Sequence, residues 1–425
     1  MEIQRRGCLK RYNTHWTGCA GRTSRGRSAR MWQFSPARRS LIGFFLMGML
    51  LAFLGAILPA WGYHLRSEYT ETGSFFLAMV AGVLASLKGA YYLLERKGLR
   101  IALSVAAGLA CAALLYLAAV PASASPYWRL AGLFLLGASI GPTSASVLHA
   151  ITPLYSRDPA ATLNLGGAFF GLGSLATVLL VGGAFYVYTV PSILIILAVI
   201  PGLFAGIFAR TNFDLIPFPR SVPLRQAVQD FKSPEAILLS LLLFIQFGNE
   251  WSIAGWMPIF LIQRLGVSPA ASLHLLAVYW LSLLVGRIAM QAILPRVRHG
   301  ALLLVCGFSA VLGCGVLFHT NNMFGATAGI LFLGIGYAAI YPLVAEMIGG
   351  RFPYYHPGFY NGLFSLATVG GLLAPWTLGI YADLWGIRAV MLVPFLGAIT
   401  VFLLTVVIRI YARLTRLPAP GEVKA

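Results

Sequence analysis

Two short stretches of sequence, 197 residues apart, decide the fold: GLFLLG at residues 132–137 and GILFLG at residues 329–334. The shift superposes Gly132 on Gly329 and Gly137 on Gly334 within them, and three further pairs beyond them: Asn164 on Asn361, Gly173 on Gly370, and Gly182 on Gly379. Small residues recur on any packed membrane helix, because glycine lets two backbones approach closely. A pair of asparagines at the same offset argues against that explanation, so we interpret the pattern as an internal repeat.

The composition of the chain indicates an integral membrane protein. Of the 425 residues, 59% are hydrophobic and only 10% are charged, whereas a soluble domain carries about 25% charged residues. Intrinsic disorder is excluded for most of the chain, because it requires few apolar residues. The net charge of +19 does not predict a nucleic-acid partner, since most basic residues lie in short segments between apolar stretches.

Apolar segments of spanning length occur twelve times. A helix needs about 20 mostly apolar residues to cross a bilayer, and the segments lie at about residues 40–62, 74–94, 101–120, 129–151, 160–184, 190–209, 236–262, 270–292, 301–319, 325–348, 359–381 and 389–410. We therefore predict an all-α membrane protein with two pseudo-symmetric six-helix bundles, residues 40–209 and 236–410. Such a parallel repeat is the architecture of a transporter whose substrate site lies between the bundles.

The N-terminal tail, the central loop between the bundles and the C-terminal tail are predicted to face the cytoplasm. With the N-terminus inside, the inner segments hold fifteen Lys or Arg residues without counting the tail, and the outer segments hold four, namely Arg66, Arg129, Arg264 and Arg388. This bias predicts a multi-pass protein of the cell inner membrane with both termini cytoplasmic. In the central loop, residues 210–235, the stretch SVPLRQAVQDFK at 221–232 is predicted to form a short amphipathic helix.

The two ends of the chain are predicted to be tails. Residues 1–39 are basic and Ser-rich with one acid, Glu2, and we expect a disordered cytoplasmic tail, with a cleavable targeting segment as the alternative. Residues 411–425 are expected to form a cytoplasmic C-terminal tail.

Four charged residues lie inside predicted spans: Lys88, Glu250, Arg287 and Glu346. Each costs roughly 2.5–3.5 kcal/mol near the bilayer centre, so each is a functional hypothesis. Glu250 lies midway along the seventh span, in FIQFGNEWSIAGW at 244–256, with Gln246 one turn before it and Asn249 beside it. Desolvation favours the neutral form of a carboxyl group, which suits a role in proton coupling or substrate binding. A permanent ion pair with Lys88 or Arg287 is the alternative.

A second group of polar residues lies towards the predicted cytoplasmic ends of the helices. Lys88 and Arg287 occupy matching places in the two halves, and Glu346 overlies His149 at the 197-residue offset. Acid and base at one depth predict a latch that closes the cytoplasmic side. The alternative is that these side chains only extend to water at the interface.

Aromatic residues at mid-depth suggest a substrate cavity. Tyr279, Trp280, Tyr337 and Tyr341 lie in the eighth and tenth spans, and aromatic faces with polar edges bind sugar rings well. We predict that they line the cavity together with Asn164 and Asn361. Packing inside a bundle, or an interfacial aromatic belt, is the alternative use of such residues.

The segments around these residues resemble the major facilitator superfamily over about residues 40–410. The superfamily's signature between spans two and three is matched by YYLLERKGLR at 91–100, where Glu95, Arg96, Gly98 and Arg100 fit and Tyr91 replaces the opening glycine. A second copy keeps only Gly286, Arg287 and the basic PRVRHG, with Pro295 in place of the acid. The resemblance implies a cytoplasmic gate formed by Lys88, Glu95, Arg96, Arg100, His149, Arg287 and Glu346.

Within the superfamily, the chain is most similar to the fucose/glucose permease group of sugar:proton symporters. The likeness lies in ATLNLGGAFFGLG (161–173), GNEWSIAGWMPIFL (248–261), GIGYAAIYPLVAEMIGGRFP (334–353) and GGLLAPWTLGIYADLWGIR (370–388). It implies alternating access, with the span-seven acid at Glu250 and the span-five asparagine at Asn164. Because the first six spans contain no Asp or Glu, proton symport depends mainly on Glu250, and an uncoupled facilitator remains an alternative.

Other classes of protein receive less support. The chain has no DDxxD, HExxH, Gly-rich phosphate loop or Walker lysine motif, and its five cysteines show no metal-ligand spacing. We therefore expect neither an enzyme nor a bound metal or cofactor, but a monomeric carrier whose partners are a small-molecule substrate, protons and the lipid bilayer. An exporter of amphipathic compounds is the second alternative, and a more apolar cavity would favour it.

Overall fold

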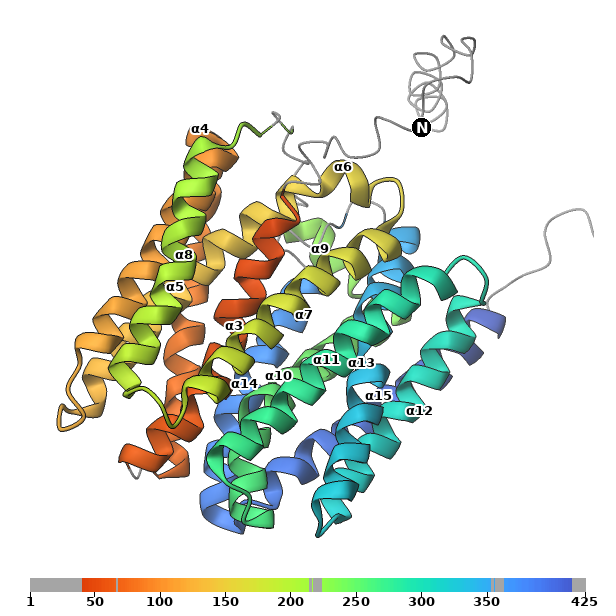
Figure 1. Cartoon of the computed structure of the whole chain (residues 1–425). Helices are drawn as coiled ribbons and strands as arrows, with labels where there is room; N and C mark the ends of the chain where they lie inside the picture. Colours follow the sequence, from red (N-terminus) through yellow and green to blue (C-terminus); the bar gives the residue numbers. More distant parts are fainter. Residues whose placement is uncertain are drawn as a thin grey trace, which may run out of the picture. The chain divides into compact units, whose positions relative to one another are not determined.

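The computed structural model describes residues 40–65, 68–213, 216, 224–352, 355 and 363–414, and helices are numbered as in Figure 1. Over these residues the chain is helical, with no strand. The N-terminal half, as we use the term, comprises α3 (Ile42–Leu65), α4 (Tyr69–Ala119), α5 (Pro126–Ala150), α6 (Thr152–Tyr155), α7 (Pro159–Ala184) and α8 (Val190–Arg210). After α9 (Leu224–Asp230), the C-terminal half comprises α10 (Pro234–Leu265), α11 (Pro269–Ile293), α12 (His299–His319), α13 (Met323–Arg351), α14 (Leu363–Trp385) and α15 (Ala389–Leu414).

The predicted spans match these helices, with one change at α4. Ten of the described helices are long and apolar enough to cross a membrane. One of them, α4, has 51 residues, about 76 Å of helix at 1.5 Å per residue, which is more than twice the roughly 30 Å of a hydrocarbon core. It therefore holds both the second and the third predicted spans. With the 23-residue α14, the number of spans reaches the predicted twelve.

A single glycine separates the two spans of α4. Gly98 has a φ of 78°, a value that glycine adopts without the steric penalty of a side chain. The chain turns back at this point, because Met79 and Leu117 from the two ends of α4 contact Gly137 and Gly132, which lie close together on α5. The short loop expected around residues 95–100 is thus a break within one helical run.

Two smaller predictions can also be compared with the structure. The amphipathic helix expected at 221–232 is present as α9, which covers Leu224–Asp230 among the described residues. The last helix, α15, continues to Leu414, four residues into the segment predicted to be a tail. Residues 1–39 and 415–425 lie outside the described residues.

The helices divide into an inner and an outer set. The most apolar window is 78% buried in α3 and 72% buried in α13, but only 33% buried in α8 and in α15. The outer helices present large apolar side chains on their free faces, for example Leu203, Val305 and Leu403. Exposed apolar faces of this extent suit lipid rather than water. The contacts between the halves are made by the inner helices, such as α7 with α11 and α3 with α10.

The glycines of the sequence repeat make equivalent contacts in the two halves. A Cβ atom on Gly173 of α7 would overlap the carbonyl oxygen of Phe45 on α3, and one on Gly370 of α14 would overlap the carbonyl oxygen of Phe244 on α10. Glycine is required at both places because the two backbones touch. The repeat seen in the sequence is therefore a repeat of helix packing, although Asn361 lies outside the described residues.

One end of the path between the halves is closed by direct helix contacts. The backbone N–H of Thr70, at the start of α4, donates to the Asp383 carboxylate of α14 at 2.8 Å, and the Thr70 hydroxyl donates to the same oxygen. Nearby, Phe76 of α4 stacks on Trp256 of α10 with ring centroids 5.9 Å apart. These contacts lie at the end predicted to face outward.

Candidate functional site

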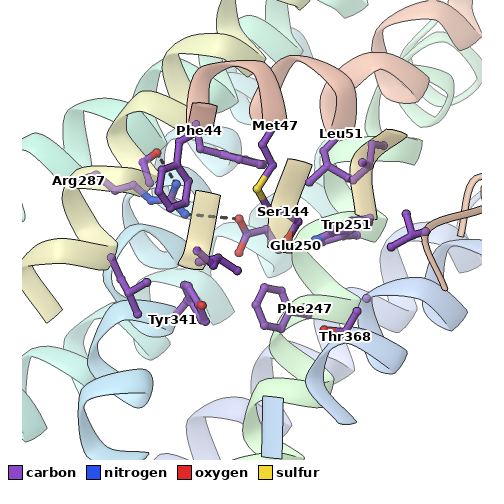
Figure 2. A pocket seen from close by; sticks show the side chains of 17 residues that line it. Phe44, Met47, Leu51, Ser144, Phe247, Glu250, Trp251, Arg287, Tyr341 and Thr368 are labelled. Carbon is purple, nitrogen blue, oxygen red and sulfur yellow. Dashed lines mark hydrogen bonds and ion pairs between the residues drawn. The ribbon is translucent and has the colours of Figure 1, made fainter. Parts of the chain in front are cut away.

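A cavity lies between the two halves, towards the end at which α3 begins (Figure 2). It encloses about 1040 Å³ of empty space, including the part open to solvent. Eight helices line it, and α3, α5, α7 and α10 each contribute three residues at helical spacing. The lining residues are Phe44, Met47, Leu51, Val83, Ile140, Ser144, Leu148, Leu163, Gly167, Phe170, Phe247, Glu250, Trp251, Arg287, Tyr341, Thr368 and Gly371.

An ion pair lies in the wall of this cavity. Glu250 of α10 and Arg287 of α11 approach to 3.7 Å, and their side chains are only 9% and 5% exposed. Of the described residues that line the cavity, these two are the charged ones. A buried pair of this kind is strongly destabilised when one partner is removed, because the other charge is left uncompensated.

Arg287 is also held by the opposite half of the protein. Its Nη1 donates to the carbonyl oxygen of Gly167 on α7 at 2.6 Å, and its guanidinium lies 5.9 Å from the ring centroid of Phe170. A second hydrogen bond joins the same two helices, since the Asn164 Nδ2 donates to the backbone oxygen of Arg287 at 2.6 Å. The structure thus brings together three of the predicted residues, Asn164, Glu250 and Arg287, across the boundary between the halves.

The two amides predicted beside Glu250 point in different directions. Gln246 precedes Glu250 by one turn and lies beside its carboxyl group. Asn249 is turned towards α15, where a Cβ atom on Gly397 would overlap its Oδ1. Gln246 is therefore placed to act on Glu250, whereas Asn249 belongs to the packing of the C-terminal half.

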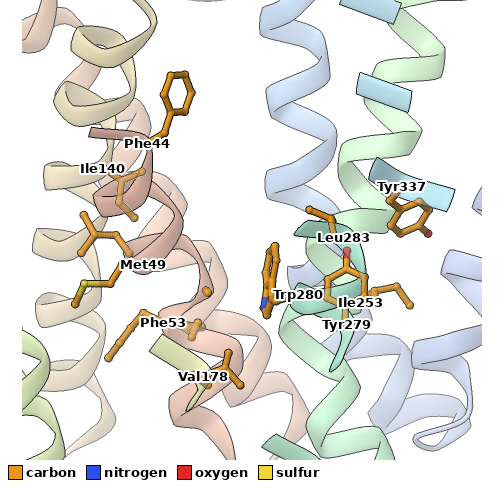
Figure 3. Packing of buried hydrophobic residues seen from close by; sticks show 14 of the residues in the cluster. Phe44, Met49, Phe53, Ile140, Val178, Ile253, Tyr279, Trp280, Leu283 and Tyr337 are labelled. Carbon is orange, nitrogen blue, oxygen red and sulfur yellow. The ribbon is translucent and has the colours of Figure 1, made fainter. Parts of the chain in front are cut away.

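Of the four predicted aromatic residues, one lines the cavity. Tyr341 faces it, with its ring 5.1 Å from that of Phe247. Tyr279, Trp280 and Tyr337 lie among packed apolar side chains (Figure 3) and are at most 3% exposed. The described part of the chain offers no hydrogen-bond partner to the Tyr279 hydroxyl or the Trp280 Nε1. These three residues support the wall from behind.

The predicted gate residues are not assembled in this structure. Glu346 pairs with His299 at 2.7 Å, within the C-terminal half. Lys88, Glu95, Arg96 and Arg100 are exposed, and His149 is buried. Among the described residues, no ion pair joins Glu346 to Lys88 or Arg287. The cytoplasmic latch remains a prediction for another conformation of the protein.

Several lining residues were not predicted from the sequence. They are mainly apolar and aromatic, and include Met47, Phe170, Phe247 and Trp251. A signal for two of them was present, since Phe247 lies three residues before Glu250 and four before Trp251, the spacing of one helix face. The others are ordinary apolar residues of spanning helices, and their sequence gives no sign of a cavity.

Comparison with known proteins identifies the family. The family described as Major Facilitator Superfamily matches residues 40–368, so the chain belongs to this superfamily. It is a multi-pass membrane transporter rather than an enzyme, as predicted.

The relatives include sugar-type transporters. A protein named glucose/galactose transporter from Brucella abortus is 25% identical over 391 residues, which cover 83% of this chain and 89% of the relative. Among solved structures, the nucleoside transporter NupG matches with a TM-score of 0.68 and 12% identity over 88% of this chain and 100% of that chain. FucP in the outward conformation matches with a TM-score of 0.62 and 15% identity over 88% and 98%. At these identities, the structures show the fold alone.

Proposed function

We propose that this protein is a secondary active transporter that moves a small polar solute, in the first place a sugar, by alternating access coupled to protons at Glu250. The observation that carries the proposal is the Glu250–Arg287 pair in the wall of a cavity between two like halves. A titratable carboxyl group thus lies in the cavity wall, and its partner Arg287 also contacts the other half at Gly167.

Proton coupling follows from the surroundings of the pair. When Glu250 takes up a proton, Arg287 loses the charge that balances it in a site with little access to water. An unbalanced buried charge is costly, so Arg287 must gain another partner. Arg287 already donates to the Gly167 carbonyl, so a polar group of a solute bound in the same cavity would be the new partner. Proton uptake at Glu250 and solute binding at Arg287 therefore favour each other.

The sugar assignment draws on the relatives and on the chemistry of one wall. One relative is named for glucose and galactose, and FucP of E. coli is titled a fucose:proton symporter. The cavity offers aromatic rings at Phe247, Trp251 and Tyr341, next to the acceptor and donors of the ion pair. Aromatic faces beside charged hydrogen-bonding groups suit a sugar ring.

Alternating access requires that the closed end open while the cavity end closes. The contacts that close it, Thr70 with Asp383 and Phe76 with Trp256, each join one half to the other. They lie at the same end of the protein, so a rocking motion of the halves would break them together. We further propose that the protein acts as a monomer in the inner membrane, with its cavity end and both termini on the cytoplasmic side.

Uptake into proteoliposomes tests the proposal. Labelled glucose, galactose and fucose are offered with and without an inward proton gradient, and with a protonophore. We expect gradient-driven accumulation of at least one sugar. Glu250→Gln should abolish accumulation, lowering it at least tenfold, but retain exchange of labelled for unlabelled sugar. Glu68→Gln, at an exposed carboxyl group, is the matched control.

Each result has a distinct meaning. Accumulation that persists in Glu250→Gln refutes the coupling role of this carboxyl group. Transport of the same rate with and without the gradient indicates an uncoupled facilitator. If none of the three sugars moves, the sugar assignment is wrong.

A further inference from the structure

The two walls of the central cavity differ in chemistry (Figure 2). The wall from the N-terminal half is apolar except for the Ser144 hydroxyl and the backbone at Gly167; its other members are Phe44, Met47, Leu51, Val83, Ile140, Leu148, Leu163 and Phe170. The wall from the C-terminal half holds the remaining polar groups: Glu250, Trp251, Arg287, Tyr341 and Thr368. We call these the apolar wall and the polar wall.

The apolar wall has almost nothing to offer a hydroxyl group. The Gly167 carbonyl oxygen already accepts from Arg287, and the other backbone groups of these helices are used within the helices. Large side chains cover the surface between them. Ser144 remains as the hydroxyl of this wall among the described residues.

This arrangement discriminates against a fully hydroxylated solute. An unmodified hexose carries hydroxyls around its whole rim, so when one edge of the ring lies on the ion pair, the opposite edge brings hydroxyls to the apolar wall. A hydroxyl that leaves water without gaining a partner weakens binding by roughly tenfold. An apolar group at the same place gains instead, because it removes apolar surface from water.

We propose that the solute of this cavity is a neutral amphipathic molecule, with its polar end on the Glu250–Arg287 pair and an apolar group against the apolar wall. For a sugar, this is a glycoside with an aryl or alkyl substituent, which should bind more tightly than the parent hexose. Neutrality follows because the two charges of the described lining residues balance each other. The inference rests on the proposed function only in taking this cavity as the solute site.

Direct binding without a proton gradient tests the class of solute. The protein is placed in phospholipid nanodiscs, because glucoside and maltoside detergents are themselves amphipathic glycosides and would compete. Two matched pairs of probes are compared: phenyl β-D-glucopyranoside with D-glucose, and phenyl β-D-galactopyranoside with D-galactose. Binding to empty nanodiscs is subtracted. We expect the phenyl compound of at least one pair to bind at least tenfold more tightly than its parent.

A substitution in the apolar wall tests where the phenyl group lies. Met47→Gln keeps a side chain of similar length and adds an amide to the wall, so the phenyl preference should fall at least threefold. Met323→Gln is the matched control, since Met323 is exposed at the start of α13, 48% accessible and outside the cavity. Thermal unfolding of both variants confirms that they are folded.

Three results overturn the inference: parent hexoses that bind as tightly as the phenyl compounds, no binding of any of the four probes, or a preference that Met47→Gln leaves unchanged. The outcome is separable from the test of proton coupling. Proton-driven accumulation of a hexose without a phenyl preference retains the proposed function and removes this inference. A phenyl preference together with accumulation that Glu250→Gln leaves unchanged retains this inference and removes the proposed coupling role of Glu250.

Discussion

Replacing Arg287 by methionine tests the central ion pair most directly. Arg287→Met keeps a long flexible side chain but removes the guanidinium. It thereby removes the pairing with Glu250 at 3.7 Å and the hydrogen bond to Gly167 at 2.6 Å. Glu250 is left with a side chain that is 9% exposed and with no cation in the cavity wall.

The size of the effect follows from the burial of the pair. Breaking a buried ion pair by removing one partner costs about 3–5 kcal/mol, because an uncompensated charge remains. Glu250→Gln leaves Arg287 in the same position and should cost a similar amount. The double variant holds no charge, and replacing both members of a buried pair by neutral groups of similar volume is often close to neutral. We therefore expect the double variant to be more stable than either single variant.

Thermal unfolding of the four proteins at neutral pH measures this coupling. A loss of 1 kcal/mol lowers the midpoint by about 2 °C or less in a chain of this size, so each single variant should lose roughly 5 °C and the double variant clearly less. The control cycle uses Glu346→Gln and His299→Gln, a pair whose side chains are 33% and 38% exposed, for which the coupling should be near zero. Additive losses at Glu250 and Arg287 would refute the reasoning.

Two further predictions concern the repeat and the orientation. Gly173→Leu and Gly370→Leu should each destabilise the protein by about 1–3 kcal/mol or more, because the new side chain meets a backbone carbonyl of α3 or α10. Gly183 has open space around it, so Gly183→Leu should be tolerated and is the control. Thermal unfolding compares the three variants, and unequal losses at Gly173 and Gly370 would contradict their equivalence. Ser123 and Lys97 are both exposed and flank opposite ends of one predicted span. In a variant without native cysteines, Ser123→Cys should therefore react with an impermeant maleimide on intact cells, and Lys97→Cys should not. The reverse pattern would invert the proposed topology.

The sequence was sufficient to predict the helices, and the reason is physical. Apolar length and the repeat of glycines are local properties, and one of the repeated pairs, Gly173 and Gly370, lies where two backbones touch in each half. The predicted break between the second and third spans was also in the right place, at Gly98. Whether the break is a loop or a reversal at a single glycine could not be predicted, because the same short stretch of sequence is compatible with both.

The orientation of each helix about its axis was harder to predict. Glu250 was identified as functional because a charge at mid-depth needs a partner, and Arg287 was one of two candidates for it. Asn249, its neighbour in the chain, is rotated by about 100° in a helix of 3.6 residues per turn and faces α15. The apolar and aromatic lining of the cavity could not be predicted for the same reason, since an apolar residue suits a cavity, a lipid face and a packed core equally.

The differences between the two halves carry more functional information than their likeness. Lys88 and Arg287 occupy matching places in the sequence, yet Lys88 is exposed while Arg287 is buried against Glu250 and Gly167. The glycines at equivalent positions keep the same contacts, because both halves must pack in the same way. Among the described residues that line the cavity, the charged pair occurs in one half alone, and it faces an apolar wall from the other half. A solute between such walls meets two different surfaces in a nearly symmetric scaffold, and the proposed coupling through one carboxyl group depends on this asymmetry.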